Sequence, residues 1–264
     1  MRASFVNHRK PFLCSVITEE TPEMSIYAIR SSEFDGAEAY LYDLRQLDIK
    51  YHTREALTRI FNATDKPIMV YYYRRANRPP VSDEVRAQTY LLSIEAGASA
   101  VDLMADLFDP SPLELTYNQD AIAKQMELIA AIRERGGEAM VSNHTLVPMS
   151  TEKVLEHARA ILTRKPDMLK IVPRAATEED LLEAFNTTAA LRKELTIPFI
   201  HIVMGKYNAI HRVVGPMLGS ALCFCVPYYN KDSTLEQPLL RATREVFRNW
   251  VWRPNASIPD GFTP

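Results

Sequence analysis

The segment "MLKIVPRA", residues 168–175, places one lysine, Lys170, inside a short apolar run. Runs of this kind, rich in β-branched residues, are typical of strands that are buried on both faces of a parallel sheet. A buried ammonium group is costly to desolvate, so the lysine must either have a charged partner or lose its proton. Both answers make this strand a candidate for carrying a functional group.

Apolar runs of similar length alternate with amphipathic segments along the whole chain. With residues 168–173, the runs predict strands at 12–17, 39–45, 67–73, 100–105, 138–144, 198–204 and 220–226. The amphipathic segments predict helices at 22–34, 54–64, 82–97, 121–136, 151–165, 177–195, 207–218 and 235–250. Eight strand–helix units in about 250 residues are the signature of a (β/α)8 TIM barrel. We therefore predict an α/β fold with this architecture.

A doubly wound sheet is the structural alternative to the barrel. No glycine-rich phosphate loop follows the first predicted strand, and the chain holds only 8 glycines, so this alternative lacks its usual signal. No linker, low-complexity tract or block of charge divides the chain. Residues 1–264 are therefore predicted to form a single barrel domain, with a proline-rich tail at 252–264 over the surface.

Composition excludes several classes of function. The net charge of −2 argues against a nucleic-acid-binding protein, which would carry an excess of basic residues. No apolar stretch is long enough to cross a membrane. The apolar run near the N-terminus is short and is followed by acids, which argues against a signal peptide. The cysteines Cys14, Cys223 and Cys225 are few and odd in number, so we predict buried free thiols in a reducing compartment, the cytoplasm, and no metal site.

Polar residues fall near the carboxyl ends of the predicted strands, where barrels of this kind carry their chemistry. Side chains alternate along a strand, so the residues that share the face of Lys170 can be chosen by parity. The polar or pocket-lining residues that this rule brings to one mouth are Asp43, Arg45, His144, Lys170 and Met204, with Arg212 in the segment that follows.

The residue types at this mouth point to one kind of chemistry. A lysine in an apolar pocket beside arginine cations has its charged form disfavoured by burial and by like charge, and its neutral amine condenses with a ketone to an imine. A neighbouring histidine is the natural group to move a proton near neutral pH. Arginines hold carboxylates by paired hydrogen bonds. From these residues we infer a Schiff-base lyase or aldolase that acts on an anionic keto-substrate.

Five segments in order resemble the type I 3-dehydroquinate dehydratases. "VMGKYNAIHRVVGPMLGSAL" (203–222) is similar to the family's Met-Gly…Arg…Phe-Gly-Ser segment, and "STLEQ" (233–237) occupies the place of its Ser-Ala-Pro-Gly-Gln lid motif. "VSNH" (141–144) and "DMLKI" (167–171) lie where the family has its catalytic histidine and its imine-forming lysine. "LYDLRQLD" (41–48) resembles the family's Glu-Leu-Arg-x-Asp strand. The resemblance extends over nearly the full chain.

The resemblance implies a dehydratase of the shikimate or quinate pathway, acting on 3-dehydroquinate. Lys170 would form the imine with the C3 ketone, and His144 would remove the C2 proton and then protonate the departing C1 hydroxyl, giving 3-dehydroshikimate and water. No metal or organic cofactor is implied, because the imine is the electron sink, and a homodimer is expected. The substrate-binding residues would be Arg212 for the carboxylate, Ser233 and Gln237 in a lid, Asp43 and Arg45 on the floor, and Met204 in the lining.

The chain departs from the family pattern after the third predicted strand, in "YYYRRANRPPVSDE" (71–84). Either Arg74 or Arg75 replaces the family's arginine there, since parity and a gapless alignment give different answers. The family's Glu-Gly-Gly is absent, and Asp83 or Glu84 is the candidate to orient the histidine instead. In the fourth strand, Met104 or Asp106 lies near the place of an expected acid.

These departures leave two alternatives to dehydration of 3-dehydroquinate. The altered pocket wall is compatible with the same imine chemistry on a related cyclic keto-acid. The second alternative is a ligand-binding or regulatory protein that keeps the pocket without turnover. The presence of both Lys170 and His144 speaks against it, because a binding protein has no need of that pair.

Overall fold

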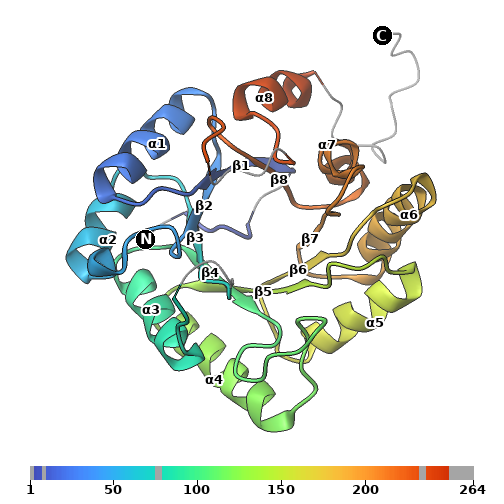
Figure 1. Ribbon diagram of the computed structural model, residues 1–264, viewed down its shortest axis with the longest axis horizontal. Coiled ribbons are helices and arrows are strands. Elements are labelled where there is room, and N and C mark those ends of the chain that lie inside the picture. The colour runs from blue at the N-terminus through green and yellow to red at the C-terminus, as the bar shows by residue number, and fades with distance from the viewer. Residues whose placement is uncertain (1–2, 8–9, 75–78, 232–235, 250–264) are drawn as a thin grey trace.

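Eight parallel strands surround a central axis, and eight helices cover them (Figure 1). The computed structural model describes residues 3–7, 10–74, 79–231 and 236–249. The strands are β1 (Phe12–Ile17), β2 (Ala39–Asp43), β3 (Ile68–Tyr71), β4 (Ala100–Met104), β5 (Glu138–His144), β6 (Met168–Val172), β7 (Phe199–His201) and β8 (Leu222–Cys225). The helices are α1 (Pro22–Phe34), α2 (Arg54–Phe61), α3 (Asp83–Glu95), α4 (Gln119–Glu134), α5 (Thr151–Leu162), α6 (Glu178–Glu194), α7 (Asn208–Leu218) and α8 (Leu240–Arg248). The predicted (β/α)8 barrel is confirmed.

The strands pair in the order β7-β6-β5-β4-β3-β2-β1-β8, so each strand lies beside its neighbours in sequence. The two end strands of this order, β7 and β8, meet at a lightly bonded seam. There the Ala221 backbone N–H donates to the Phe199 carbonyl at 2.8 Å, and the His201 N–H donates to the Ser220 hydroxyl at 3.2 Å. These contacts make the sheet a nearly closed barrel.

Helix boundaries follow the local signals in the sequence, with one large difference. Helix α8 begins at Leu240, where the sequence pattern predicts a start at residue 235. Pro238 disfavours helical geometry in the residue before it, and its carbonyl accepts a hydrogen bond from the Val226 N–H at 3.0 Å. The chain therefore runs beside the end of β8 before the helix starts. Among the helices of the described ranges, none combines the length and apolar character needed to cross a bilayer.

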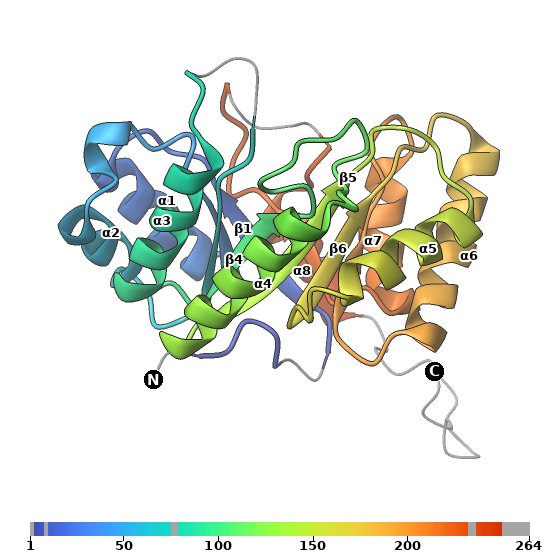
Figure 2. The same cartoon turned by 90° about the horizontal axis from the view of Figure 1, so that it is seen from below.

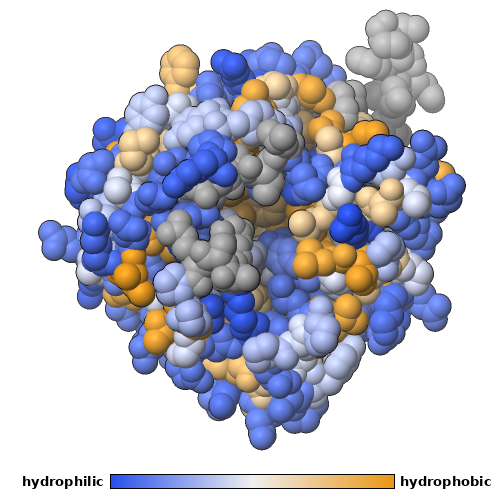
Figure 3. Space-filling model, viewed as in Figure 1, coloured by the Kyte–Doolittle hydropathy of each residue, from blue (hydrophilic) through white to orange (hydrophobic). Residues whose placement is uncertain are grey.

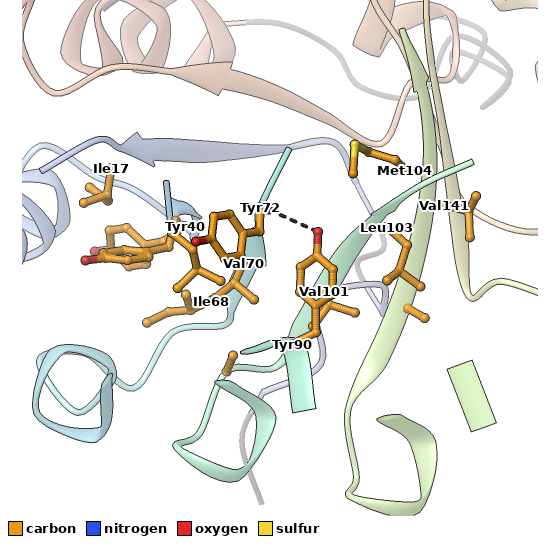
Figure 4. Packing of buried hydrophobic residues seen from close by; sticks show 14 of the residues in the cluster. Ile17, Tyr40, Ile68, Val70, Tyr72, Tyr90, Val101, Leu103, Met104 and Val141 are labelled. Atoms are coloured by element: carbon orange, nitrogen blue, oxygen red, sulfur yellow. Dashed lines mark hydrogen bonds between the residues drawn. The ribbon is translucent and has the colours of Figure 1, made fainter. Parts of the chain in front are cut away.

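The apolar core has two parts, one inside the barrel and one between the strands and the helices. Figure 4 shows the second part around Tyr72 and Tyr90, where the Tyr72 N–H donates to the Tyr90 hydroxyl at 3.1 Å. The Tyr90 hydroxyl in turn donates to the backbone carbonyl of Asp102 at 3.0 Å. The predicted core cysteines are buried free thiols on both sides of the sheet. This packing fixes which side chains of each strand point inward.

The amino ends of the strands are closed by residues that precede β1. Phe5 is fully buried and packs edge-to-face on Phe12, with ring centroids 5.5 Å apart. The carboxylate of Glu138 accepts hydrogen bonds from the backbone N–H groups of Phe5 at 2.7 Å and Val6 at 3.1 Å. Access to the interior is therefore from the opposite end, where the loops that follow the strands gather (Figure 2).

Candidate active site

Lys170 lies at the centre of β6 and points into the barrel. Met168 and Val172, two residues to either side, belong to the core inside the barrel, while Leu169 and Ile171 pack between the sheet and the helices. The parity predicted for this strand is therefore confirmed. The lysine is 3% exposed, which means that its ammonium group cannot be solvated by bulk water.

The Lys170 amine is paired with a carboxylate inside the barrel. Its Nζ lies 2.8 Å from Oδ2 of Asp102 on β4 and 2.5 Å from the hydroxyl of Tyr73. The Tyr73 hydroxyl also donates to the same carboxylate oxygen. Of the two answers that the buried lysine allowed, the structure therefore gives the ion pair. The expectation of an amine beside arginine cations is wrong, because the charged group in contact with Lys170 is an acid.

Strand register explains why these three side chains meet. Tyr71 pairs with Asp102 across β3 and β4, and Ser142 pairs with Lys170 across β5 and β6. Tyr73 follows Tyr71 by two residues, so it lies on the same inward face and one step nearer the mouth. Its hydroxyl is 3.2 Å from the Ser142 hydroxyl, and burial followed by the Asp102 charge raises the pKa of Tyr73 well above its ordinary value.

His144 is the last residue of β5 and stands at the mouth beside Tyr73. Their rings meet edge-to-face with centroids 4.9 Å apart. Nδ1 of His144 lies 2.7 Å from a carboxylate oxygen of Glu114, a residue of the loop between β4 and α4. This bond assigns the proton to Nδ1 and leaves Nε2 as the basic nitrogen. The imidazole is therefore oriented by a carboxylate.

The segment that the sequence proposed for this orienting acid lies elsewhere. Asp83 forms ion pairs with Arg74 and, at 2.8 Å, with Arg86, and Glu84 is exposed on the first turn of α3. Although burial opposes it, hydrogen bonding from Arg74 holds the pKa of Asp83 below its ordinary value. The expectation that Asp83 or Glu84 orients His144 is therefore wrong, and Glu114 is the residue in contact.

Arg74 also does not face the amine. Its guanidinium donates to the Asp106 carboxylate at 2.7 Å as well as to Asp83, which directs it toward α3 and away from the barrel interior. Tyr73 takes the inward position at this end of β3. Arg75, the other candidate, lies outside the described residues. Met104 is buried and pairs with Ser142 across β4 and β5, so an apolar side chain occupies the place where an acid was expected.

The predicted floor residues Asp43 and Arg45 are both buried at the end of β2. The Asp43 carboxylate accepts hydrogen bonds from the Tyr71 hydroxyl at 2.8 Å and from the Arg45 backbone N–H at 2.9 Å. The Arg45 side chain reaches the Tyr73 carbonyl at 3.5 Å. Met204 is half-buried just after β7 and packs against the core inside the barrel. These residues surround the interior from the sides of β2, β3 and β7.

Arg212 lies on α7 with a buried guanidinium. The residue is 5% exposed, and Nε and Nη1 have no hydrogen-bond partner among the described residues. Burial lowers the pKa of Arg212 from its ordinary value. Gln237 is half-buried, and its backbone carbonyl accepts from the Tyr229 hydroxyl at 3.1 Å. Ser233 lies outside the described residues.

A cavity of about 670 Å³ opens between the loops that follow β2 and β3. Lys170, His144 and Arg212 are not among its lining residues, and Tyr73 is the residue that belongs to both the cavity wall and the lysine cluster. Figure 3 shows this face of the molecule, which is hollowed near its centre. The lining residues are Arg45, Leu47, Asp48, Ile49, His52, Tyr72, Tyr73, Arg74, Pro79, Pro80, Val81 and Arg86.

The sequence prediction missed Tyr73 as a partner of the lysine, and it missed Asp102 and Glu114 entirely. Asp102 could have been found, because it has inward parity on the fourth strand and is the acid that a buried lysine needs. Glu114 gives no such signal, since it lies in a loop whose path does not follow from periodicity.

Comparison with known proteins adds a second line of evidence. The model of the family described as Type I 3-dehydroquinase matches residues 16–249. The 3-dehydroquinate dehydratase of Geobacillus thermodenitrificans is 25% identical over 243 residues, which cover 86% of each chain. The structure of the Geobacillus kaustophilus 3-dehydroquinate dehydratase aligns with a TM-score of 0.77 at 20% identity, covering 92% of both chains. The Clostridium difficile type I enzyme, solved with covalently modified comenic acid, gives 0.77 at 16% identity and covers 92% of this chain and 93% of that one.

The two solved structures share the fold of this chain, and at 20% and 16% identity the fold is what they show. The family model is the stronger finding because it spans most of the sequence, from the end of β1 to the end of α8. The expectation of an enzyme of the carbon–oxygen lyase class is confirmed by the family and by the names of the relatives. This chain therefore belongs to the type I 3-dehydroquinase family.

Proposed function

We propose that this protein converts 3-dehydroquinate to 3-dehydroshikimate and water through an imine on Lys170, with His144 as the general acid and base. The observation that carries the proposal is that the two side chains come from adjacent strands and both contact Tyr73 at the inner mouth of the barrel. The family membership of the chain supports the choice of substrate. Covalently modified comenic acid in the Clostridium difficile relative supports the covalent route.

The chemistry follows from the imine. Once the C3 ketone has condensed with the Lys170 amine, the protonated C=N group withdraws electrons and acidifies the C2 hydrogen. Nε2 of His144 takes that proton, and the same imidazole returns it to the C1 hydroxyl, so that the C1–O bond breaks and water leaves. Water then hydrolyses the conjugated imine and releases the product. Glu114 holds the imidazole in the tautomer that this sequence of steps requires.

Arg212 is proposed to bind the substrate carboxylate. Its guanidinium is buried and has two nitrogen atoms without a partner among the described residues, a state that a bound carboxylate would relieve. Asp43, Arg45, Met204 and Gln237 are proposed to hold or line the rest of the ring. Arg74 forms ion pairs with the carboxylates of Asp83 and Asp106, so it is not proposed to bind the substrate. The roles of Ser233 and Arg75 stay predictions.

The biological setting is also part of the proposal. The imine supplies the electron sink, so the proposed reaction needs no metal or organic cofactor. A cytoplasmic homodimer in the shikimate or quinate pathway is the setting that the family suggests. The predicted extent of the domain, 1–264, and its tail at 252–264 stay predictions, because residues 250–264 lie outside the described ranges.

A related cyclic keto-acid is the second candidate substrate. The observation in its favour is the altered wall, in which the Tyr73 ring and the buried Met104 occupy places where the family pattern has an arginine and an acid. These side chains make the site less polar than the family pattern implies. A smaller or less polar substrate would fit such a wall while using the same imine.

The experiment that tests the proposal combines an absorbance assay with borohydride trapping. Incubation with 3-dehydroquinate should produce the absorbance of a conjugated enone, and reduction should add one substrate-derived mass to the peptide that contains Lys170. Lys170→Met should abolish the label, whereas His144→Ala should retain it and lose product formation.

Each other result has a definite meaning. A label on Lys206 or Lys231 would overturn the site assignment. Turnover of a related keto-acid without turnover of 3-dehydroquinate would establish the second candidate. Tight binding of 3-dehydroquinate without any product would establish a binding protein in place of an enzyme.

A further inference from the structure

Tyr73 links the Lys170 amine to a buried carboxylate through its hydroxyl group. The amine donates to this hydroxyl at 2.5 Å, and the hydroxyl donates to Oδ2 of Asp102. The Ser142 hydroxyl lies 3.2 Å away on the other side. The Tyr73 oxygen is therefore an acceptor from the nitrogen and a donor to the acid at the same time, which is the arrangement that a proton relay needs.

Asp102 has the capacity to take a proton from this chain. The residue is fully buried, and its second oxygen, Oδ1, has no hydrogen-bond partner among the described residues. A buried carboxylate with an open lone pair gains from protonation once its cationic partner has become neutral. Burial and the Asp102 charge raise the pKa of Tyr73, so the resting phenol keeps its proton and is available as a donor.

Imine formation from a lysine that starts as an ammonium requires this kind of relay. The ammonium nitrogen carries three hydrogens, and the nitrogen of the protonated imine carries one. The two protons that leave nitrogen both end on the ketone oxygen, which departs as water, so the overall step consumes and releases no net proton. With the lysine 3% exposed, bulk solvent is not positioned to carry them.

We propose that Tyr73 is a catalytic residue that relays these two protons between Lys170, Asp102 and the substrate oxygen, a role that rests on the proposed function. The ammonium first gives one proton to Asp102. The amine then attacks the carbonyl carbon, the C–N bond forms, and the oxygen takes the Tyr73 proton while the tyrosinate takes one from nitrogen. The Asp102 proton finally passes through Tyr73 to the carbinolamine hydroxyl, the C–O bond breaks, and the nitrogen lone pair forms the imine.

The variant that tests this role is Tyr73→Phe, because it keeps the ring that packs on Tyr71 and His144 and removes only the hydroxyl. In single-turnover borohydride trapping with 3-dehydroquinate, we expect the saturating rate of Lys170 labelling to fall about a hundredfold. The substrate concentration for half-maximal rate should stay within about threefold of the unmodified protein, since the side chains proposed to bind the carboxylate and the ring are unchanged.

Tyr40→Phe is the matched control, because it removes the hydroxyl of another strand tyrosine that does not line the cavity. Tyr40 lies on β2 and packs on the helix side of the sheet, as Figure 4 shows, where its hydroxyl donates to the Ile29 carbonyl at 3.1 Å and cannot reach the amine. Its labelling rate should equal that of the unmodified protein. If Tyr73→Phe labels as fast as this control, the relay is overturned and the proposed function stands. If the unmodified protein is not labelled at all, the proposed function itself fails.

A second measurement on the unmodified protein keeps the proposal testable should Tyr73→Phe not fold. The saturating labelling rate should be lower in D2O than in H2O, because protons move between oxygen and nitrogen as the imine forms. Equal rates in the two solvents would contradict the relay.

Discussion

Glu114 illustrates how much of this site depends on a single backbone conformation. Its φ of 51° lies in the left-handed region, which residues other than glycine rarely adopt. The side chain of Asn143 holds the loop there by donating to the backbone carbonyls of Leu113 and, at 3.2 Å, of Glu114 itself. Asn143 precedes His144 in β5, so one strand both presents the imidazole and secures the acid that orients it.

Replacement of this acid should separate imine formation from dehydration. In Glu114→Gln the imidazole loses the negative charge that supports it as a base, so we expect the rate of product formation to fall about ten- to a hundredfold. Labelling of Lys170 by borohydride should proceed at its normal rate, since Glu114 does not contact the amine.

Glu84→Gln is the control for this change, because Glu84 is exposed on α3 and is one of the two residues that the sequence suggested for the role. Its kinetics should equal those of the unmodified protein. A loss of activity in Glu84→Gln with none in Glu114→Gln would show that the contact at 2.7 Å has no part in the reaction.

At the scale of residues, parity predicted which side chains of β5 and β6 face inward, but not what they touch. Lys170 and His144 follow from alternation along single strands. The Lys170–Asp102 pair depends on the register among three strands, and the Glu114 contact depends on the path of a loop. Neither the strand register nor the path of the loop is encoded in the periodicity of one segment. For this reason the sequence pattern predicted the Lys170 amine beside arginines.

At the scale of elements, the sequence carries its helix starts explicitly. Thr177 precedes α6 as its N-cap, and its hydroxyl accepts from the Asp180 N–H at 3.1 Å. The Asp180 carboxylate accepts in return from the Thr177 N–H at 3.0 Å, which completes a capping box. The two bonds satisfy donors that no carbonyl of the helix can reach.

Loss of this cap should have a measurable cost. Thr177→Ala removes the hydroxyl that accepts from Asp180, and we expect the free energy of unfolding to fall by about 1 kcal/mol. Urea denaturation monitored by circular dichroism is the measurement. Thr196→Ala, at an exposed threonine beyond the other end of α6, is the control and should leave the midpoint unchanged. Equal effects of the two substitutions would contradict the capping role.

The bounds of helices and strands were predictable where the signal is local, and the prediction was wrong where a distant contact decides them. Helix α5 begins at the predicted residue 151, with Ser150 as its N-cap, and β1 and α1 have the predicted bounds. The predicted start of α8 was wrong because the amphipathic pattern continues upstream of Pro238. There the backbone is hydrogen-bonded to the end of β8. The hydrogen bond between these two distant segments outweighs the local preference of the sequence for a helix.

At the scale of the whole molecule, two buried histidines tie stability to pH. His201 on β7 and His211 on α7 are fully buried, and both lie against the Thr188 hydroxyl of α6. Burial lowers the pKa of His211 to about 4 and that of His201 well below its ordinary value. The folded protein therefore holds both rings neutral where an unfolded chain would protonate them.

Stability should fall as the pH drops. An unfolded histidine titrates near pH 6.5, so the full stability is present above that pH and is lost progressively toward pH 4 as the unfolded chain binds protons. For His211 alone the loss at pH 4 is about 3 kcal/mol.

His211→Gln tests this linkage, because glutamine does not titrate. The difference in unfolding free energy between pH 7.5 and pH 5, measured by urea denaturation, should be smaller in this variant than in the unmodified protein. An identical difference in both proteins would show that His211 has no part in the acid sensitivity.

The fold as a whole was the most predictable property, since eight alternating units leave few topologies that bury every strand. The way the ring closes was not predictable. Every other pair of neighbouring strands has a ladder, whereas β7 and β8 meet through the Ala221 and His201 contacts in the described residues.

This seam has a mechanical consequence. A distortion of a barrel costs least where the fewest hydrogen bonds must break, and here that place is the gap between the three-residue β7 and β8. The connection across the gap contains α7, and with it the buried guanidinium of Arg212. We therefore expect the barrel to deform most easily at this gap, and a displacement there would carry α7 and the Arg212 guanidinium with it.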